Sequence, residues 1–371
     1  MMMQLVGENP KLRIKNYLRK FDRYRKNKMT HVANLLLSVL GNTRDAQPEL
    51  VAANDVKQIL IVRSNDRVGN TVFLIPFIRQ VQHHYPQAKI TLLLNKPWQQ
   101  TLFAHMGIDT FAFANLSFSS LPECIASLRG LRQQVFDLCL SPSTSAQSSI
   151  LCALMSARNK VAATSRYDAA FTHTFPVRKA YSHAALCNLS LLPQIHSSAQ
   201  QASPWNSHQL SISTDECHAG LETKTMLAPD DSLCLAFFRG ARGDKKLTDV
   251  EWLNVLRQFE RAHHQPITWI EVMGPEIEAP LCRDIQTYRS KSLRELACFL
   301  RHADGFISCD TGPLHLADAA GASCIGLYTH TDPAVYGLLG ERCFHITDLE
   351  HIDAATILHR LEAAKVLPQA A

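Results

Sequence analysis

Apolar runs of strand length alternate with helical periodicity along most of the chain. Residues 58–63 form such a run, residues 71–85 repeat apolar positions at helical spacing, and residues 90–94 form the next run. A strand, a helix and a strand in this order predict two parallel strands joined by a right-handed crossover. Similar runs begin again at residues 232–238 and 267–272. The pattern therefore predicts an α/β protein with two Rossmann-like domains.

The same pattern sets the domain boundaries. We expect an N-terminal arm and linker at residues 1–55, a first domain at residues 56–200 and a second domain at residues 208–371. Residues 196–210 are rich in Ser, Gln and Ala and contain a proline, which is typical of a connection between domains. The terminal helix, at about residues 353–366, is expected to cross back to the first domain.

The composition narrows the class of protein. The 371 residues are 46% hydrophobic and 19% charged, as in an ordinary soluble protein with two full cores. No apolar run approaches the roughly 18 residues of a membrane span, and the N-terminus lacks a signal-peptide core, so we expect a cytoplasmic protein. The eleven cysteines show no C-x-x-C or Cys/His ligand spacing. This predicts reduced thiols and no metal site.

The positive charge is concentrated in one segment. Residues 11–28 hold nine Lys and Arg against one acid, Asp22, so this segment carries +8 and the rest of the formal +5 chain carries −3. Nucleic acid is therefore not an expected partner. Ile14, Leu18 and Phe21 recur at helical spacing, and a basic amphipathic helix suits the anionic inner surface of a membrane. The alternative is a helix that packs on the protein with its charges in solvent.

A turn after the apolar run at residues 306–309 carries the clearest chemistry. Asp310 or Thr311 can cap the helix that follows, and Gly312 lets the backbone approach a ligand. Open parallel sheets bind ligands at this carboxyl edge, and a helix N-terminus favours phosphate. The alternative is a capped loop with His315 in the core.

Two other loops follow predicted strands. Arg242 and Lys245 lie in a basic loop that contains two glycines, and we expect them to bind phosphate. The alternative is a loop whose charges are only solvated. Gly274 and Glu276 form a turn after residues 267–272. No G-x-G-x-x-G follows the first strand and no Walker lysine occurs, which disfavours an NAD-dependent oxidoreductase and a P-loop enzyme.

These motifs together resemble glycosyltransferase family 9, the heptosyltransferases. The D-T-G-P-L-H-L-A sequence from Asp310 and the T-H-T-D-P sequence from Thr329 resemble the half of those enzymes that binds the nucleotide sugar. Residues 58–70 resemble the family's opening pattern, a strand followed by R-x-(N)-(D)-R-x-G-(D). Lys245 fits the lysine of the family's K-x-W-P loop, although L-T replaces W-P, and residues 273–276 resemble its G-G-P-x-E turn.

The resemblance implies a fold, an activity and a set of donor contacts. It implies the GT-B architecture, in which two Rossmann-like domains face a central cleft, the first for the acceptor and the second for the nucleotide sugar. It also implies inverting transfer of heptose from ADP-heptose to the lipopolysaccharide inner core, without a bound metal or cofactor. The residues implied to face the donor are Arg242, Lys245, Gly274, Glu276, Asp310, Thr311, Gly312 and His315.

One residue departs from the family pattern. The family usually has an aspartate after the loop glycine that accepts the proton of the acceptor hydroxyl, and this chain has Asn70 there. An amide cannot act as a general base near neutral pH, so Asp66 is the nearest candidate, with Arg63 and Arg67 expected to keep it ionised. Asp66 could instead be a turn-forming aspartate. A non-catalytic relative that binds nucleotide sugar or core, or a transferase for another sugar, also stays open.

Overall fold

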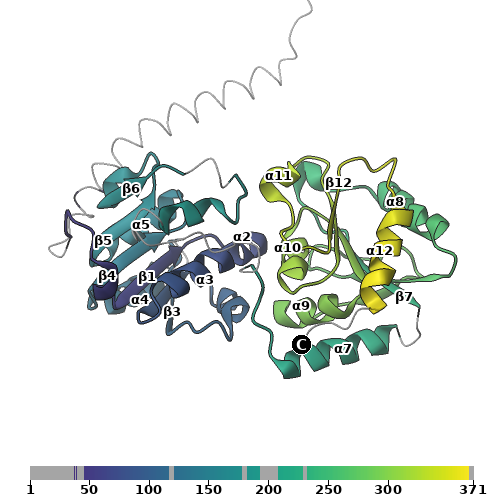
Figure 1. Cartoon of the computed structure of the whole chain (residues 1–371), viewed down its shortest axis with the longest axis horizontal. Coiled ribbons are helices and arrows are strands. Elements are labelled where there is room, and N and C mark those ends of the chain that lie inside the picture. Colours follow the sequence, from purple (N-terminus) through teal and green to yellow (C-terminus); the bar gives the residue numbers. More distant parts are fainter. Residues whose placement is uncertain are drawn as a thin grey trace, which may run out of the picture.

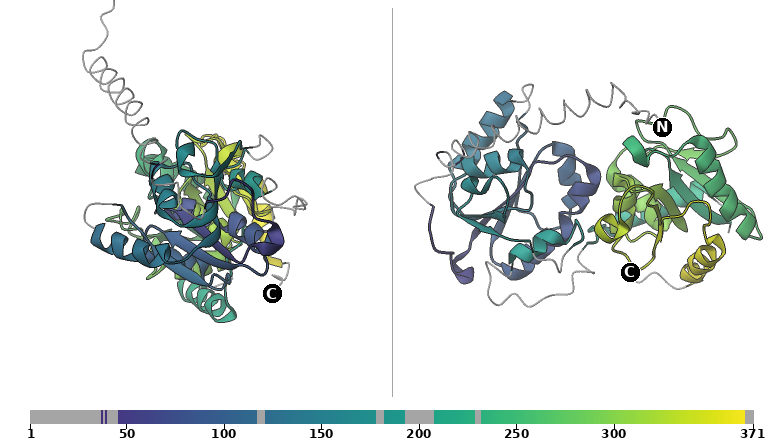
Figure 2. Two further views of the ribbon diagram at one scale, coloured as in Figure 1. Left: turned by 90° about the vertical axis from the view of Figure 1, so that its left-hand side faces the viewer. Right: turned by 90° about the horizontal axis from the view of Figure 1, so that it is seen from above.

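The chain forms two lobes, each built on one parallel sheet (Figure 1). The computed structural model describes residues 37, 39, 46–116, 121–177, 182–192, 208–228 and 232–366. The predicted basic helix at residues 11–28 and most of the predicted interdomain connection lie outside these residues. The view from above also shows the two lobes as separate bodies (Figure 2, right).

The first lobe contains a six-stranded sheet in the order β3-β2-β1-β4-β5-β6. Each strand is an apolar run, and the central strands are buried on both faces, as expected for a parallel sheet covered by helices. The strands are β1 (Gln58–Arg63), β2 (Lys89–Leu94), β3 (Thr110–Phe113), β4 (Phe136–Ser141), β5 (Ala157–Ala163) and β6 (His173–Phe175). The helices are α2 (Val68–Val72), α3 (Ile75–His84), α4 (Leu121–Arg132) and α5 (Ala146–Leu154), with 3-10 turns η1 (Ala53–Asp55), η2 (Pro97–Phe103), η4 (Asp168–Ala170) and η5 (Cys187–Leu191).

The helix predicted at residues 71–85 is in fact two helices, α2 and α3. Pro76 lies in the first turn of α3. A proline ring clashes with the carbonyl four residues earlier, which here belongs to Val72, the last residue of α2. The break leaves α2 as a short separate helix at the carboxyl edge of the first sheet, facing the second lobe (Figure 1).

The second lobe repeats the strand order of the first, β12-β11-β10-β7-β8-β9. In both sheets the first and fourth strands of the domain are neighbours, so the chain changes direction across the sheet between them. Its strands are β7 (Leu233–Phe238), β8 (Ile267–Val272), β9 (Gln286–Tyr288), β10 (Gly305–Cys309), β11 (Cys324–Leu327) and β12 (Cys343–Ile346). Its helices are α7 (Thr214–Leu227), α8 (Asp249–Ala262), α9 (Leu293–His302), α10 (Gly312–Ala319), α11 (Pro333–Tyr336) and α12 (Ala354–Val366), with one 3-10 turn, η7 (Gly243–Lys245).

The described part of the terminal helix does not cross to the first domain as expected. Ile357, Leu358 and Leu361 of α12 belong to a buried cluster of the second domain that also contains Trp252 and Phe259 of α8. Figure 1 shows α12 beside α8, on the outer side of the second lobe. The apolar face of α12 is therefore covered within its own domain.

A helix start in the second domain also differs in part from its sequence pattern. The Ser292-Leu293-Arg294-Glu295 sequence predicts a capping box. Ser292 caps α9 as expected, because its Oγ accepts a hydrogen bond from the Glu295 N–H at 3.1 Å. The Glu295 carboxylate, however, accepts from the N–H of Lys291 rather than from that of Ser292. The cap is present and the reciprocal bond of the box is not.

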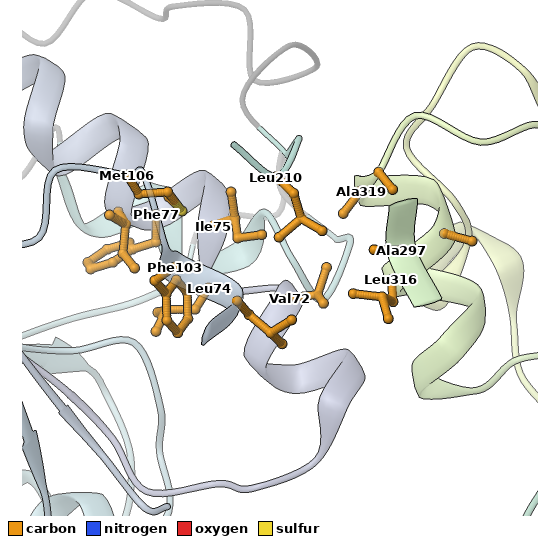
Figure 3. Packing of buried hydrophobic residues seen from close by; sticks show 14 of the residues in the cluster. Val72, Leu74, Ile75, Phe77, Phe103, Met106, Leu210, Ala297, Leu316 and Ala319 are labelled. Atoms are coloured by element: carbon orange, nitrogen blue, oxygen red, sulfur yellow. The ribbon is translucent and has the colours of Figure 1, made fainter. Parts of the chain in front are cut away.

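An apolar contact joins the two lobes. Val72 and Leu74 of the first domain belong to the same buried cluster as Leu316 and Ala319 of α10 in the second domain. Figure 3 shows Leu74, Val72 and Leu316 in one row between the lobes, with Leu210 and Ala319 above them. Arg294 adds polar links, since its guanidinium donates to the carbonyl of Thr101 on η2 at 3.1 Å. The junction between the domains is thus packed at α2 and α10.

Candidate functional site

A charged cluster lies where β10 ends, at the carboxyl edge of the second sheet. The ammonium of Lys245, from the loop after β7, is 2.7 Å from Asp310 Oδ2 and 3.0 Å from the Asp310 carbonyl oxygen. His315 Nε2, one turn into α10, is 2.9 Å from the other carboxylate oxygen, Oδ1. Because β7 and β10 are the two strands between which the chain reverses, this cluster sits at the switch point where open α/β sheets bind ligands.

Asp310 remains a carboxylate at neutral pH despite its burial. Only 7% of the residue is exposed, and burial alone would raise its pKa. Hydrogen bonds from His315 and Lys245, together with their charges, outweigh burial and lower the pKa of Asp310 to about 2. The carboxylate therefore fixes the positions of the lysine and the histidine in the donor-free protein.

The start of α10 is not capped by either residue that the sequence suggested. Thr311 occupies the N-cap position, but its side chain makes no capping bond and its Oγ1 instead pairs with Ser308 Oγ at 2.9 Å. The Asp310 carboxylate is taken up by Lys245 and His315. The first-turn N–H groups of α10 therefore have no side-chain acceptor among the described residues, as an anion-binding helix start requires.

Gly312 and Gly69 bring the two signature motifs together. A Cβ on Gly312 would lie 2.7 Å from the Cβ of Val68 on α2, and a Cβ on Gly69 would lie 3.1 Å from the His315 ring. Only glycine allows the backbones of α2 and α10 to approach this closely. As a result α2, the helix of the first domain that carries Asn70, packs against α10 next to His315.

Glu276 lies over a pair of glycines. Cβ atoms added to Gly240 and Gly274 would come within 2.4 Å and 2.8 Å of its carboxylate oxygens. The turn after β8 is thereby packed on the loop after β7. Arg242, in that same loop, is exposed, and no hydrogen bond or ion pair holds it among the described residues. It is free to meet an anion.

Sequence reasoning did not single out Arg239, although it shapes the same loop. Its Nε lies 2.5 Å from the fully buried Glu271 of β8, its Nη1 contacts Asp249 of α8 at 2.8 Å, and its Nη2 donates to the carbonyl of Ala279. All three of these partners of Arg239 are groups of the second domain, so its guanidinium holds the loop after β7 against β8 and α8. The only sequence signal was an arginine directly after a buried strand.

Asp66 has a different partner from the one expected. Its carboxylate lies 3.3 Å from the ammonium of Lys96, and not within ion-pair distance of Arg63 or Arg67. The Asp66 side chain is 42% exposed, which leaves it open to solvent at the carboxyl edge of the first sheet. Arg63 turns inward instead, donating to the carbonyls of Pro142 at 2.6 Å and Asn70 at 3.3 Å.

Several buried side-chain atoms near the contact of α2 with α10 have no hydrogen-bond partner among the described residues. Arg63 Nε, His315 Nδ1 and Thr331 Oγ1 are buried and have no hydrogen-bond partner within the described ranges. They come from the end of β1, from α10 and from the loop after β11. Buried polar atoms usually find partners, so three such atoms on elements at one edge of two sheets indicate a ligand site.

His173 lies away from this site. Its Nε2 is 3.1 Å from the carbonyl oxygen of Pro48 and its Nδ1 is 2.8 Å from Thr172 Oγ1. His173 begins β6, the last strand at one side of the first sheet, where it is in register with Val161 of β5. Its role there is to hold the segment that precedes the first domain.

The described residues were predicted to contain neither a metal site nor a membrane span. These residues contain no group of three or more His, Cys, Asp and Glu arranged to hold a metal ion. None of the helices among them is both long and apolar enough to cross a bilayer. All eleven cysteines are free thiols, as predicted.

Two six-stranded parallel sheets, joined by a packed junction and with a charged cluster at the switch point of one of them, have the GT-B architecture. The sequence model of glycosyltransferase family 9 (heptosyltransferase) matches residues 125–364. The chain therefore belongs to this family, and the fold and family expected from its motifs are confirmed.

Solved structures support the fold at low sequence identity. A family 9 glycosyltransferase from Veillonella parvula is 17% identical, with a TM-score of 0.67 over 84% of this chain and 92% of that one. E. coli ADP-heptose lipopolysaccharide heptosyltransferase II is 14% identical, with a TM-score of 0.65 over 83% and 99%. E. coli heptosyltransferase WaaC with ADP is 19% identical, with a TM-score of 0.62 over 82% and 99%. No curated protein matches the chain.

Proposed function

We propose that this glycosyltransferase moves heptose from ADP-heptose to the inner core of lipopolysaccharide, with inversion at the anomeric carbon. The observation that carries the proposal is the meeting of Lys245, Asp310 and His315 at the switch point of the second sheet. The family to which the chain belongs and the ADP bound by the structurally similar WaaC are consistent with a nucleotide-sugar donor. On this proposal residues 208–371 bind the donor and residues 56–200 bind the acceptor.

The leaving diphosphate needs positive charge as the glycosidic bond breaks. Lys245 and Arg242 would supply it from the loop after β7, and the uncapped start of α10, at Thr311 and Gly312, would add backbone N–H donors. These groups stabilise the departing ADP without a metal ion. The turn of Gly274 and Glu276 would lie beside the nucleotide.

The acceptor hydroxyl must lose its proton as it attacks. Asn70 cannot accept that proton, since its amide nitrogen lone pair is delocalised into the carbonyl. We assign the general-base role to Asp66, the carboxylate of the same loop. Its side chain is 42% exposed, so an acceptor hydroxyl can reach it, and its one ion pair among the described residues, with Lys96, lies at the surface. The assignment follows from the sequence and is tested below.

The arm adds a proposal about location. Residues 11–28 have the charge and spacing of a helix that binds an anionic membrane surface. A lipopolysaccharide precursor is anchored in a membrane, so an arm of this kind would bring the acceptor domain to its substrate. We propose that the protein works in the cytoplasm, peripherally on the inner membrane.

One experiment tests the transfer itself. Purified full-length protein is incubated with ADP-heptose and a series of truncated core acceptors, and the products are weighed by mass spectrometry. A mass gain of one heptose on one acceptor is the expected result. If the protein transfers only from another ADP-sugar, the proposed sugar, heptose, is wrong and the protein is a transferase for that other sugar. Donor binding by calorimetry without any transfer would instead favour a nucleotide-sugar-binding relative, as Asn70 suggests.

A further inference from the structure

Residues just before η5 in the first domain hydrogen-bond to the backbone of α11 and of the residue that follows it in the second domain. The Ala184 N–H donates to the carbonyl of Val335 at 2.8 Å, and His183 Nε2 lies 2.9 Å from the carbonyl oxygen of Gly337. His183 is only 9% exposed. Figure 1 shows α11 on the side of the second lobe that faces the first. Both bonds therefore fix α11 relative to the acceptor half.

The two ring nitrogens of His183 have opposite roles. A carbonyl oxygen can only accept a hydrogen bond, so Nε2 carries a hydrogen and donates to the Gly337 carbonyl oxygen. Nδ1 lies 3.2 Å from the Ala185 N–H and must accept. The ring is thus the neutral imidazole, and a second proton on Nδ1 would set two donors against each other.

The second domain holds the same backbone from the other side. The Leu338 N–H donates to His345 Nε2 at 2.8 Å, and the next two backbone N–H groups donate to the carboxylate of Asp318 on α10 at 2.9 Å each. The segment after α11 is therefore clamped between the domains. His183 is the side chain that the first domain contributes to this clamp.

The loop on the other side of α11 contains a polar side-chain atom without a hydrogen-bond partner among the described residues. Residues 328–332 join β11 to α11, and Asp332 caps α11 by accepting from the Ala334 N–H at 2.8 Å. Within this loop Thr331 Oγ1 is buried and has no hydrogen-bond partner among the described residues. Leaving a buried hydroxyl unpaired is unfavourable, so a ligand atom that pairs with it would bind well there.

We propose that His183 is a positioning residue for donor binding: from the acceptor domain it holds residues 328–332, which we call the donor loop, in the shape that accepts a nucleotide sugar. The inference rests on the proposed function, because the loop meets a donor only if the second domain binds one. It couples the two halves of the enzyme, since separating the domains releases the loop.

The coupling depends on pH. Burial lowers the pKa of His183, as do His315 and His345, while the Gly337 carbonyl and the Asp318 carboxylate raise it; the net direction is downward from the ordinary value of about 6.5. Phe73, the residue that follows α2, adds an uncharged contact, since its ring lies 5.7 Å from the His183 ring. Since the neutral form makes both bonds, the clamp is intact above the folded-state pKa. It is lost as the pH falls through that value.

Two substitutions separate positioning from simple packing. The amide N–H of His183→Gln can reach the place of Nε2 and donate to Gly337, whereas the shorter His183→Asn cannot. Neither side chain titrates in this range. His173 is the control, because it also uses both ring nitrogens but lies at the far edge of the first sheet. The full-length proteins are titrated by calorimetry with ADP-heptose and with ADP, in a pH series that starts at about pH 8 and descends as far as the wild type stays folded, and their melting temperatures are recorded.

We expect His183→Asn to weaken ADP-heptose binding about 3–10-fold at the higher pH, the effect of one lost hydrogen bond, and His183→Gln to weaken it less. Wild type should lose affinity more steeply than either His183 variant once the pH falls through the folded-state pKa of His183, and His173→Gln should follow wild type. If His183→Asn binds the donor as wild type does at about pH 8, the positioning role is wrong. If wild type binds neither ligand, the proposed function itself fails.

Discussion

Gly312 of the second domain lies directly against Val68 of the first, with no room for a side chain between them. A Cβ on Gly312 would be 2.7 Å from the Val68 Cβ and 3.3 Å from the Gly69 backbone nitrogen. This contact closes the junction between α2 and α10, next to Asp310 and His315. The geometry of the candidate site therefore depends on how closely the two domains meet at Gly312.

Gly312→Ala should strain this junction. The nearest atom is the Val68 Cβ, which is bonded directly to the backbone of α2 and cannot rotate away, so we expect overpacking of about 1–3 kcal/mol, relieved by opening of the domains. The measurements are the melting temperature and the transfer rate, both of which should fall. Gly130→Ala is the matched control, because a Cβ at Gly130 in α4 would meet nothing within 4 Å. An active Gly312→Ala enzyme of wild-type stability would show that the domains close elsewhere.

Lys245→Ala should weaken donor use. Its ammonium is held at 2.7 Å by Asp310 and would contribute a charge-assisted hydrogen bond to the diphosphate of about 1.5–3 kcal/mol, or roughly 10–100-fold in kcat/KM for the donor. The substitution also removes a partner of the buried Asp310. Melting curves and the double variant Lys245→Ala/Asp310→Asn separate that effect. Lys246→Ala is the neighbouring control, and kinetics equal to wild type in Lys245→Ala would remove the lysine from the site.

Much of the framework could be predicted because buried strands are apolar runs. The runs at residues 58–63 and 267–272 match β1 and β8, and the turn after residues 306–309 is where the structure places the charged cluster. The break at Pro76 was also visible in the sequence, since a proline four residues after Val72 cannot continue the helix. Local rules of this kind need no tertiary information.

Contacts between distant segments could not be predicted in this way. Lys96 pairs with Asp66 because β1 and β2 end side by side, whereas the sequence offered only the adjacent Arg63 and Arg67. The surface that α12 covers is decided by the apolar residues of α8, not by its own pattern. His183 had no motif, and only the crossing of the domain junction gives it a partner in Gly337.

The arm gives a prediction about membranes. If residues 11–28 form a helix on the membrane surface, liposomes rich in anionic lipid should bind the full-length protein, and added salt should weaken that binding. A protein that starts near Asp55 should bind less and keep its activity on a soluble acceptor. Cosedimentation at two salt concentrations measures both. Equal binding with and without the arm would mean that its charges have only a structural role.

The assignment of the base is tested first at Asp66. Asp66→Asn keeps the shape of the loop and removes the proton acceptor, so turnover should fall by roughly 10²–10⁴ while donor affinity stays nearly constant. Lys96→Ala is a useful comparison, because it removes the partner of Asp66 and leaves the carboxylate in place. Full activity in Asp66→Asn would place the base on another residue.

The second half of this test asks whether position 70 faces the acceptor hydroxyl. Asn70 lies on α2 beside the junction with α10, next to Gly69, whose Cβ position is 3.1 Å from the His315 ring. A carboxylate introduced there by Asn70→Asp would restore the residue that the family usually has. In the Asp66→Asn background it should recover turnover, and the acid limb of the pH–rate profile should return with it. No recovery, with donor binding intact, would mean that the hydroxyl is activated from a different part of the cleft.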